Sequence, residues 1–385
     1  MNSIALKDLK PKIFFSKPLF LDEGFVLLAP ETPVDEGLIK RLAQWEFRET
    51  KTEGIPLDEA AADDAPANQG EDAVDQVTLP DGAGDKERVE RILAYYLDFT
   101  AYMDSLYTRF VTKTELDYTE LSERIKGLCQ VITQNRRFLL RAQSLAPQHK
   151  NYLVSHAARS SVYSIVLGII MKLPLFKLIE LGTAAALHEI GMVRLPPQLY
   201  MADRILSPQE KKSITAHTIL GYNLLKERQL PPAVCLAALE HHERMNGVGY
   251  PRALTGEKIS LYSKIIMVAC SFDAATAIRP FREAKDGYSG MVDIIKNEGK
   301  QYDDIVIRSL VYGLSIYPIG TYIMLTNGKS AVVVDISPDN PRYPVVQILG
   351  SLNPDGKDII IRTSETSVRV FRPLSKKEIE TIKKS

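Results

Sequence analysis

The residues best suited to chemistry in this sequence are its histidines. Two of them, His241 and His242, are adjacent and precede Glu243 and a glycine-rich loop that reaches Pro251. Imidazole and carboxylate groups together suit Fe, Mn or Zn. Because adjacent residues on a helix point about 100° apart, such a pair can serve two neighbouring metals. The pair therefore either fills space at a helix end or holds metal.

The remaining histidines bear on this choice. A single histidine is more often a core or surface residue than a ligand. Here His156, His188 and His217 precede the pair at wide spacing, and Glu189 follows His188 directly. The joint pattern, rather than any one of these residues, predicts a metal centre.

The elements that must position these residues are helical. Residues 147–312 are predicted to form a mainly helical domain, and residues 86–146 a helical connector before it. The connector has apolar residues at three- and four-residue steps: Ile92, Tyr96, Phe99 and Met103. Thr112 and Glu115 have capping-box spacing, which predicts a break between two helices there. The connector either serves signalling or dimerisation, or covers the domain that follows.

Smaller regions flank the helices. Residues 1–53 are predicted to form a small N-terminal α+β module. Residues 54–85 contain many acids and no Lys or Arg, which predicts a disordered acidic linker or, alternatively, a partner-binding acidic tail. Residues 313–374 are predicted to form a small β domain, because Asn327-Gly328 separates two apolar runs in a hairpin pattern. Residues 375–385 form a Lys-rich tail.

Composition excludes several classes of function. The formal net charge is zero, with 48 basic and 48 acidic residues, so nothing favours a nucleic acid polymer as partner. The longest apolar run, Val162 to Met171, is about half of a membrane span, which favours a buried core helix and no membrane span. Three cysteines and no apolar leader predict a reducing, cytoplasmic location.

Five segments in order resemble the HD-GYP family, a branch of the HD metal-dependent phosphohydrolases. The segments are HAARSS from His156, ALHEIGMVRLP from Ala186, AHTILGYNLL from Ala216, HHERMNGVGYP from His241 and IIMVACSFDAATAIRPFREA from Ile265. Their order and spacing agree over roughly 160 residues, which is far more specific than one short motif.

The resemblance implies a mainly α protein whose core is an HD-type helical bundle with a centre of two divalent metals, usually Fe or Mn, with Zn also compatible. It implies hydrolysis of cyclic di-GMP to linear pGpG, GMP or both through a metal-bound hydroxide. His188 and Glu189 would be catalytic, with Glu189 bridging the metals. The implied metal ligands are His156, His188, Glu189, His217, His241, His242 and Cys270.

The resemblance also implies a substrate site. The GYP loop would shape the pocket, and two arginines match phosphate-contacting positions, a role that suits the guanidinium group. The implied substrate-binding residues are Asn246, Gly247, Gly249, Tyr250, Pro251, Arg279 and Arg282.

Four positions depart from the family pattern. Glu189 replaces an Asp and adds a methylene, Met192 replaces a Lys and removes a cation, and Cys270 replaces an Asp ligand with a soft sulfur. Tyr152 stands where three-metal members carry a Glu, which argues against a third metal. Asp273 lies three residues beyond Cys270 but matches a different family position, so it is not assigned as a ligand.

Three interpretations stay open on the sequence alone. The chain is an active cyclic di-GMP phosphodiesterase with an altered site; or a degenerate domain that binds metal or cyclic di-GMP as a receptor; or a structural protein whose histidines are relics. The intact histidines and GYP loop favour the first. A homodimer through the connector and a protein partner of the N-terminal module are the predicted assemblies.

Overall fold

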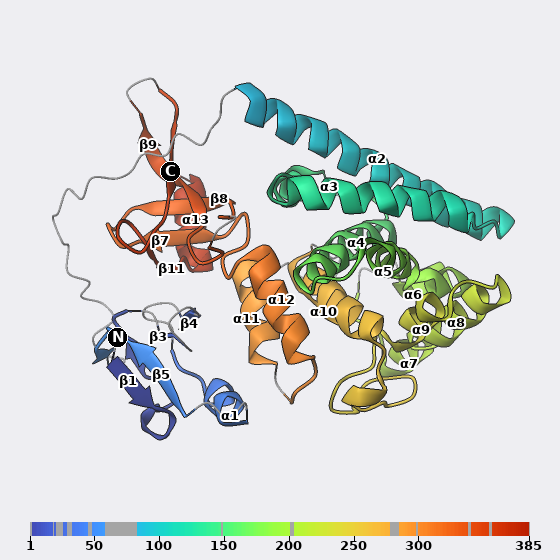
Figure 1. The fold of residues 1–385 in the computed structure, drawn as a ribbon, viewed down its shortest axis with the longest axis horizontal. Coiled ribbons are helices and arrows are strands. Elements are labelled where there is room, and N and C mark those ends of the chain that lie inside the picture. Colours follow the sequence, from blue (N-terminus) through green and yellow to red (C-terminus); the bar gives the residue numbers. More distant parts are fainter. Residues whose placement is uncertain are drawn as a thin grey trace. The chain divides into compact units, whose positions relative to one another are not determined.

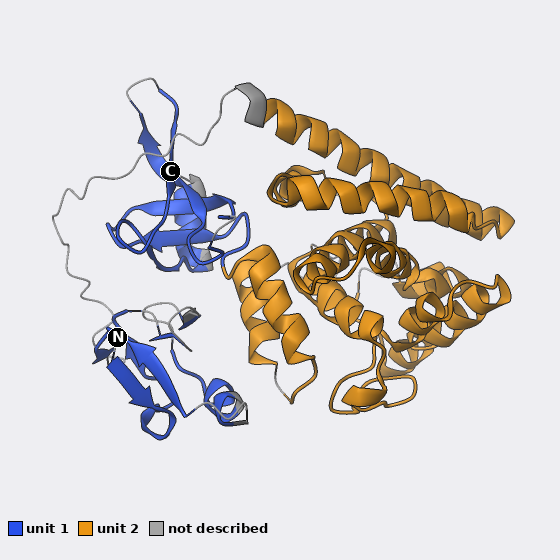
Figure 2. Cartoon of the chain, viewed as in Figure 1, with its two compact units in different colours: residues 1–82, 317–385 blue, residues 83–316 orange. Residues whose placement is uncertain are grey.

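The computed structural model divides the chain into two compact units, residues 83–316 and residues 1–82 with 317–385 (Figure 2). The residues that it describes are 2–17, 19–20, 26–28, 33–44, 48–57, 83–147, 149–200, 204–277, 285–297, 299–337, 340–353 and 356–384.

The unit of residues 83–316 is helical, as the sequence predicted (Figure 1). Its long helices are α2 (Ala83–Lys113), α3 (Tyr118–Leu145), α4 (Tyr152–Ile170), α5 (Leu175–Leu187) and α10 (Leu261–Thr276). Its shorter elements are η3 (Ile190–Arg194), α6 (Pro197–Tyr200), α7 (Pro208–Ile214), α8 (His217–Glu227), α9 (Pro232–Glu240), η4 (Gly256–Lys258), α11 (Gly287–Lys296) and α12 (Asp304–Leu314).

Helix α4 lies at the centre of this unit and packs against α2, α3, α5, α10 and α12. Most of its residues are buried, including polar ones such as Ser160, Ser161 and Ser164, as expected for a helix surrounded by other helices. Within the described part of the chain, α4 is the one helix long and apolar enough to span a bilayer, and 78% of its apolar window is buried inside the protein. The buried core helix predicted from the apolar run Val162 to Met171 is thus α4, in which that run is buried as far as Gly168 except for the half-buried Tyr163.

Helices α2 and α3 form an antiparallel pair that packs on α4 and α5 (Figure 1). The periodic residues of the predicted connector are all buried, as expected for a cover: Ile92, Tyr96, Phe99 and Met103. The predicted break between two helices is confirmed, since α2 ends at Lys113 and α3 begins at Tyr118. Thr112 does not form the capping box, because its hydroxyl donates to the Thr108 carbonyl inside α2. The N-cap of α3 is Asp117, whose carboxylate accepts from the Glu120 N–H at 2.9 Å.

The N-terminal module contains β1 (Asn2–Ala5), β2 (Phe14–Phe15), β3 (Leu19–Phe20), β4 (Val26–Leu28), α1 (Glu36–Gln44), β5 (Glu49–Thr52) and β6 (Pro56–Leu57), with η1 (Leu6–Asp8) after the first strand. Four strands form a sheet in the order β1-β5-β3-β4, and β2 pairs with β6. Leu19 and Leu42 are among its fully buried side chains. Strand β6 lies within the segment predicted as linker, and residues 58–82 lie outside the described residues.

The C-terminal β region is a five-stranded antiparallel sheet in the order β10-β9-β8-β7-β11. Its strands are β7 (Tyr322–Leu325), β8 (Ser330–Asp335), β9 (Val345–Leu352), β10 (Asp358–Arg362) and β11 (Val370–Pro373), followed by α13 (Lys376–Lys384). The predicted hairpin at Asn327-Gly328 joins β7 to β8, and Gly328 has φ +76°. This conformation suits glycine, which explains the turn signal in the sequence.

Candidate metal centre

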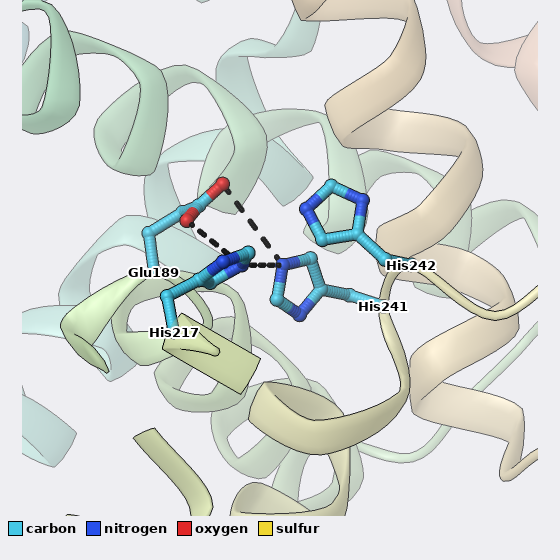
Figure 3. A group of neighbouring side chains, drawn as sticks. All are labelled: Glu189, His217, His241 and His242. Atoms are coloured by element: carbon cyan, nitrogen blue, oxygen red, sulfur yellow. Dashed lines mark hydrogen bonds and ion pairs between the residues drawn. The ribbon is translucent and has the colours of Figure 1, made fainter. Parts of the chain in front are cut away.

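Two groups of side chains that could hold a metal ion meet inside the helical unit. The first, called here the His241 group, contains Glu189, His217, His241 and His242 (Figure 3). The second, called here the His156 group, contains His156, His188 and Glu189. Within each group the ligand atoms lie within 4.8 Å of one another. Glu189 belongs to both, which is the geometry that a bridging carboxylate needs.

The ligands reach this position mainly because helix ends converge there. His188 is the C-cap of α5, His217 is the first residue of α8, and His241 is the C-cap of α9. His156 comes from the first turns of α4. All four of these imidazoles are buried, with at most 4% of the residue exposed. Residues far apart in the sequence are thus gathered into one water-poor cluster.

Gly191 explains how Glu189 comes so close to His217. A Cβ atom at position 191 would lie 1.9 Å from the His217 carbonyl oxygen and 2.5 Å from the Gly221 nitrogen. Only glycine therefore lets η3 pack directly on α8. As a result, the Glu189 carboxylate lies 3.4 Å from His217 Nε2 and 3.9 Å from His241 Nε2.

Three histidines are fixed in one tautomer by backbone carbonyls. Nδ1 of His188 lies 2.7 Å from the Ala185 oxygen, Nδ1 of His217 lies 2.6 Å from the Ile214 oxygen, and Nδ1 of His241 lies 3.0 Å from the Ala238 oxygen. A carbonyl only accepts, so each Nδ1 carries the proton and each neutral ring presents a bare Nε2. Metal-binding histidines are held in this way.

His156 is held by a carboxylate instead. Its Nδ1 lies 2.6 Å from Asp273 Oδ2, and the Arg159 guanidinium donates to the same carboxylate. Burial by itself raises the pKa of Asp273, but Arg159 and His156 hold it below its ordinary value. Asp273 is therefore a partner of a histidine, a role that the sequence analysis did not assign. The three-residue step from His156 to Arg159 on one helix is the sequence signal for it.

The side chains present fit divalent cations. His217 Nε2 and His241 Nε2 lie 3.2 Å apart, and two bare nitrogens at that distance repel unless a cation lies between or beside them. His188 Nε2 and Glu189 Oε2 are buried without a hydrogen-bond partner among the described residues. Buried polar atoms are normally paired, so these atoms point to a ligand.

The protonation states agree with metal binding. Burial lowers the pKa of His188 to about 4 and holds the pKa values of His241 and His242 well below their ordinary value. Burial alone would raise the pKa of Glu189, but the neighbouring histidines, His217 first, lower it to about 2. Neutral imidazoles and an ionised carboxylate are the forms that bind metal.

Comparisons with known proteins support the family resemblance of the helical unit. Residues 142–306 match the model of the HD domain family. A cyclic di-GMP phosphodiesterase, PdeB of Borreliella burgdorferi, is 28% identical over 241 residues, 60% of this chain and 62% of that protein. The cyclic di-GMP phosphodiesterase PA4108 of Pseudomonas aeruginosa is 25% identical over 83% of this chain and 76% of that protein. The chain carries an HD-GYP domain.

One further relative and one solved structure are similar to different parts of this chain. The 3'3'-cGAMP-specific phosphodiesterase 3 of Vibrio cholerae is 30% identical over 43% of this chain and 36% of that protein. A solved structure of an HDG"Y"P protein from Bdellovibrio bacteriovorus covers 80% of this chain and 97% of that chain, with 16% identity and a TM-score of 0.49. The chain spans less than two thirds of the length of the Borreliella protein.

Cys270 lies outside both ligand groups of the HD-GYP domain. Its Sγ is 3.4 Å from the Met267 carbonyl on its own helix, and burial raises the pKa of the thiol to about 12. The thiol is thus hydrogen-bonded within its own helix and belongs to neither ligand group. Tyr152 stacks on His156 with ring centroids 5.5 Å apart, and Met192 is half-buried in η3.

The GYP loop lies against the histidine pair. The Tyr250 ring stacks on His242, with centroids 4.7 Å apart, and the Tyr250 N–H donates to the His242 carbonyl. A Cβ at Gly249 would lie 2.4 Å from the Glu243 backbone, so glycine is required. Gly247 has φ +79°, and the Asn246 amide donates to the Gly299 carbonyl at 2.6 Å.

Two other predicted substrate contacts, Arg279 and Arg282, lie outside the described residues. Pro251 follows Tyr250 through a cis peptide bond. Of the predicted substrate-binding residues, the structure therefore brings the GYP loop to the metal centre through Tyr250, whereas Asn246 points its amide toward the segment around Gly299.

Proposed function

We propose that this chain is a metal-dependent phosphodiesterase that hydrolyses cyclic di-GMP to linear pGpG, GMP or both. The observation that carries the proposal is the convergence of five imidazoles on the buried carboxylate of Glu189. Four of the five rings have Nδ1 bonded to a carbonyl or a carboxylate, which leaves Nε2 for metal.

The substrate class follows from the relatives. PdeB and PA4108 are named cyclic di-GMP phosphodiesterases, and a further relative is named for 3'3'-cGAMP. All three names describe cleavage of a cyclic dinucleotide. Cyclic di-GMP is therefore the first substrate to test, and 3'3'-cGAMP is the second.

The proposed cofactor is a pair of divalent ions, iron or manganese, with zinc also suited to these ligands. His156 and His188 would hold one ion, His217, His241 and His242 the other, and Glu189 would bridge them. Such ions lower the pKa of water and stabilise negative charge on phosphoryl oxygens. Cys270 stays outside this proposed ligand set.

The protein's own groups have three tasks in this reaction. The carbonyls of Ala185, Ile214 and Ala238 and the carboxylate of Asp273 keep the imidazoles in the binding tautomer. Tyr250 and the glycines beside it shape the substrate pocket over His242. Arg279 and Arg282 are proposed, from the motif, to bind phosphate oxygens through their guanidinium groups.

The test is turnover by protein purified without oxygen and loaded with iron or manganese. Cyclic di-GMP and its products are followed by chromatography, beside a His241→Ala, His242→Ala variant, with metal counted in the same samples. Linear or mononucleotide product from the native protein alone supports the proposal. Protein that holds metal yet gives no product from either dinucleotide contradicts it.

Three further proposals concern the surroundings of the enzyme. We propose a homodimer through α2 and α3, and a protein partner for the N-terminal module. We also propose a reducing cytoplasmic location, because the three cysteines are free and buried. Light scattering on the purified chain measures the first, and affinity capture by residues 1–57 of a defined candidate measures the second.

A further inference from the structure

Two buried carboxylates flank the histidine pair in the chain. Glu240 is the last residue of α9 and Glu243 follows His242; the two residues are 2% and 0% exposed. Neither belongs to a ligand group. Buried carboxylates are rarely left without partners, so their contacts reveal what they do.

Glu243 binds the backbone of the loop that connects α9 to α10, residues 244–260, called here the 244–260 loop. Its Oε1 accepts from the Arg252 N–H at 2.8 Å, and its Oε2 accepts from the Leu254 N–H at 2.9 Å. These two amides lie one and three residues after Pro251. Glu243 therefore closes the loop immediately behind the residue that stacks on His242.

Glu240 binds the end of the same loop. Its Oε1 accepts from the Arg252 guanidinium, and its Oε2 accepts from the Ser260 N–H at 3.0 Å and from the Ser263 hydroxyl at 2.9 Å. Ser260 is the N-cap of α10. Arg252 thus joins the two acids, through its N–H to Glu243 and through its side chain to Glu240.

All four carboxylate oxygens of this pair accept from N–H or O–H donors of the loop or of α10. Both acids are thus held by structural contacts, and neither belongs to a ligand group. We propose that Glu240 and Glu243 are positioning residues that fasten the 244–260 loop to the histidine pair and so hold Tyr250 over His242, an inference whose catalytic part rests on the proposed function. The substrate contact that they would organise is the contact of Tyr250 with the cyclic dinucleotide.

The principal test replaces Glu243 with Gln. The amide keeps the shape of the side chain but offers one carbonyl oxygen to two N–H donors. Amide hydrogen exchange at Arg252 and Leu254 is expected to become at least about tenfold faster. With the native enzyme active, KM for cyclic di-GMP is expected to rise about tenfold, with kcat within about threefold and metal content unchanged.

The matched control is Glu180→Gln. Glu180 accepts the Tyr262 hydroxyl at 2.8 Å in the same domain and does not contact the 244–260 loop. It should leave amide exchange in the loop and KM unchanged. In a Tyr250→Ala background, Glu243→Gln should add no further rise in KM, because both changes remove the same contact.

The outcomes separate this inference from the proposed function. Unchanged exchange at Arg252 and Leu254 in Glu243→Gln overturns the inference, whatever the activity. Faster exchange with native KM in an active enzyme overturns the positioning role. Faster exchange in a chain that never turns over cyclic di-GMP supports the role of Glu243 in holding the 244–260 loop and rejects the proposed function. Should Glu243→Gln not fold, Arg252→Met removes the Glu240 contact from a side chain that is 43% exposed, with the same readouts.

Discussion

The two ligand groups of the metal centre are built unequally. The His241 group has four donors, and the rings of His217 and His241 are fixed by backbone carbonyls. The His156 group has three donors, and the ring of His156 depends on the Asp273 carboxylate. The residue at the family's last ligand position, Cys270, lies outside both. With two metals bound as proposed, the larger number of donors predicts that the His241 group holds its metal more tightly than the His156 group.

The largest effect is expected from His241→Ala. This change removes a donor from the His241 group, so the metal of that group should be lost. The turnover of cyclic di-GMP should then fall by more than about 100-fold. Metal analysis and product chromatography measure both. His149→Ala is the matched control, because His149 bonds only to Asn151 in the described structure and lies outside both groups. Equal losses in the two variants would contradict the assignment.

Asp273→Asn tests the weaker group. It removes the charge that holds His156 Nδ1, and loss of such a partner typically costs 10–100-fold, so the affinity of the His156 group for metal should fall by about that factor. The affinity of the His241 group should stay the same. A metal titration of the metal-free protein that resolves two affinities measures the effect. Equal weakening of both affinities would remove the distinction between the groups.

Acidification should weaken the metal-free fold through His188. Its pKa is about 4 in the folded protein and about 6.5 when unfolded, so the unfolded chain binds more protons between these values. The contribution of His188 is complete above about pH 6.5 and is lost as the pH falls toward 4. The contribution of His188 to the free energy of unfolding should drop by about 2 kcal/mol from about pH 7 to about pH 5.

Urea titration at the two pH values measures this drop. In His188→Gln, the difference between the two pH values should shrink by that amount, because the buried imidazole is gone. An undiminished difference in the variant would assign the pH dependence to other groups.

The smallest effect is expected from Cys270→Ser. The thiol is hydrogen-bonded to its own helix and lies outside both ligand groups, so metal content and turnover should stay within about threefold of the native values. For the same reason, we expect no thiolate-to-metal absorption band when the native protein is loaded with cobalt. Loss of one metal in Cys270→Ser would show that the His156 group includes this sulfur.

Much of the fold could be predicted because local patterns carry it. The period of Ile92, Tyr96 and Phe99 predicted a buried helical face, and Asn327-Gly328 predicted a hairpin. The break between α2 and α3 was predicted from Thr112 and Glu115, but its cap was not: Thr112 lies inside α2, which ends at Lys113, and the N-cap of α3 is Asp117. Spacing alone does not show whether a hydroxyl bonds forward to a new helix or backward within its own.

The sequence by itself determined the inventory of the site: which residues are imidazoles, their order along the chain, and the GYP loop after the pair. Tertiary structure decided which of these groups contact one another. It paired Asp273 with His156, 117 residues away in the chain, and turned Cys270 toward its own helix. It also brought the Glu243 carboxylate into hydrogen bonds with the backbone amides of Arg252 and Leu254. The physical reason is that residue types fix what a group can donate or accept, whereas packing of distant helices fixes which group it meets.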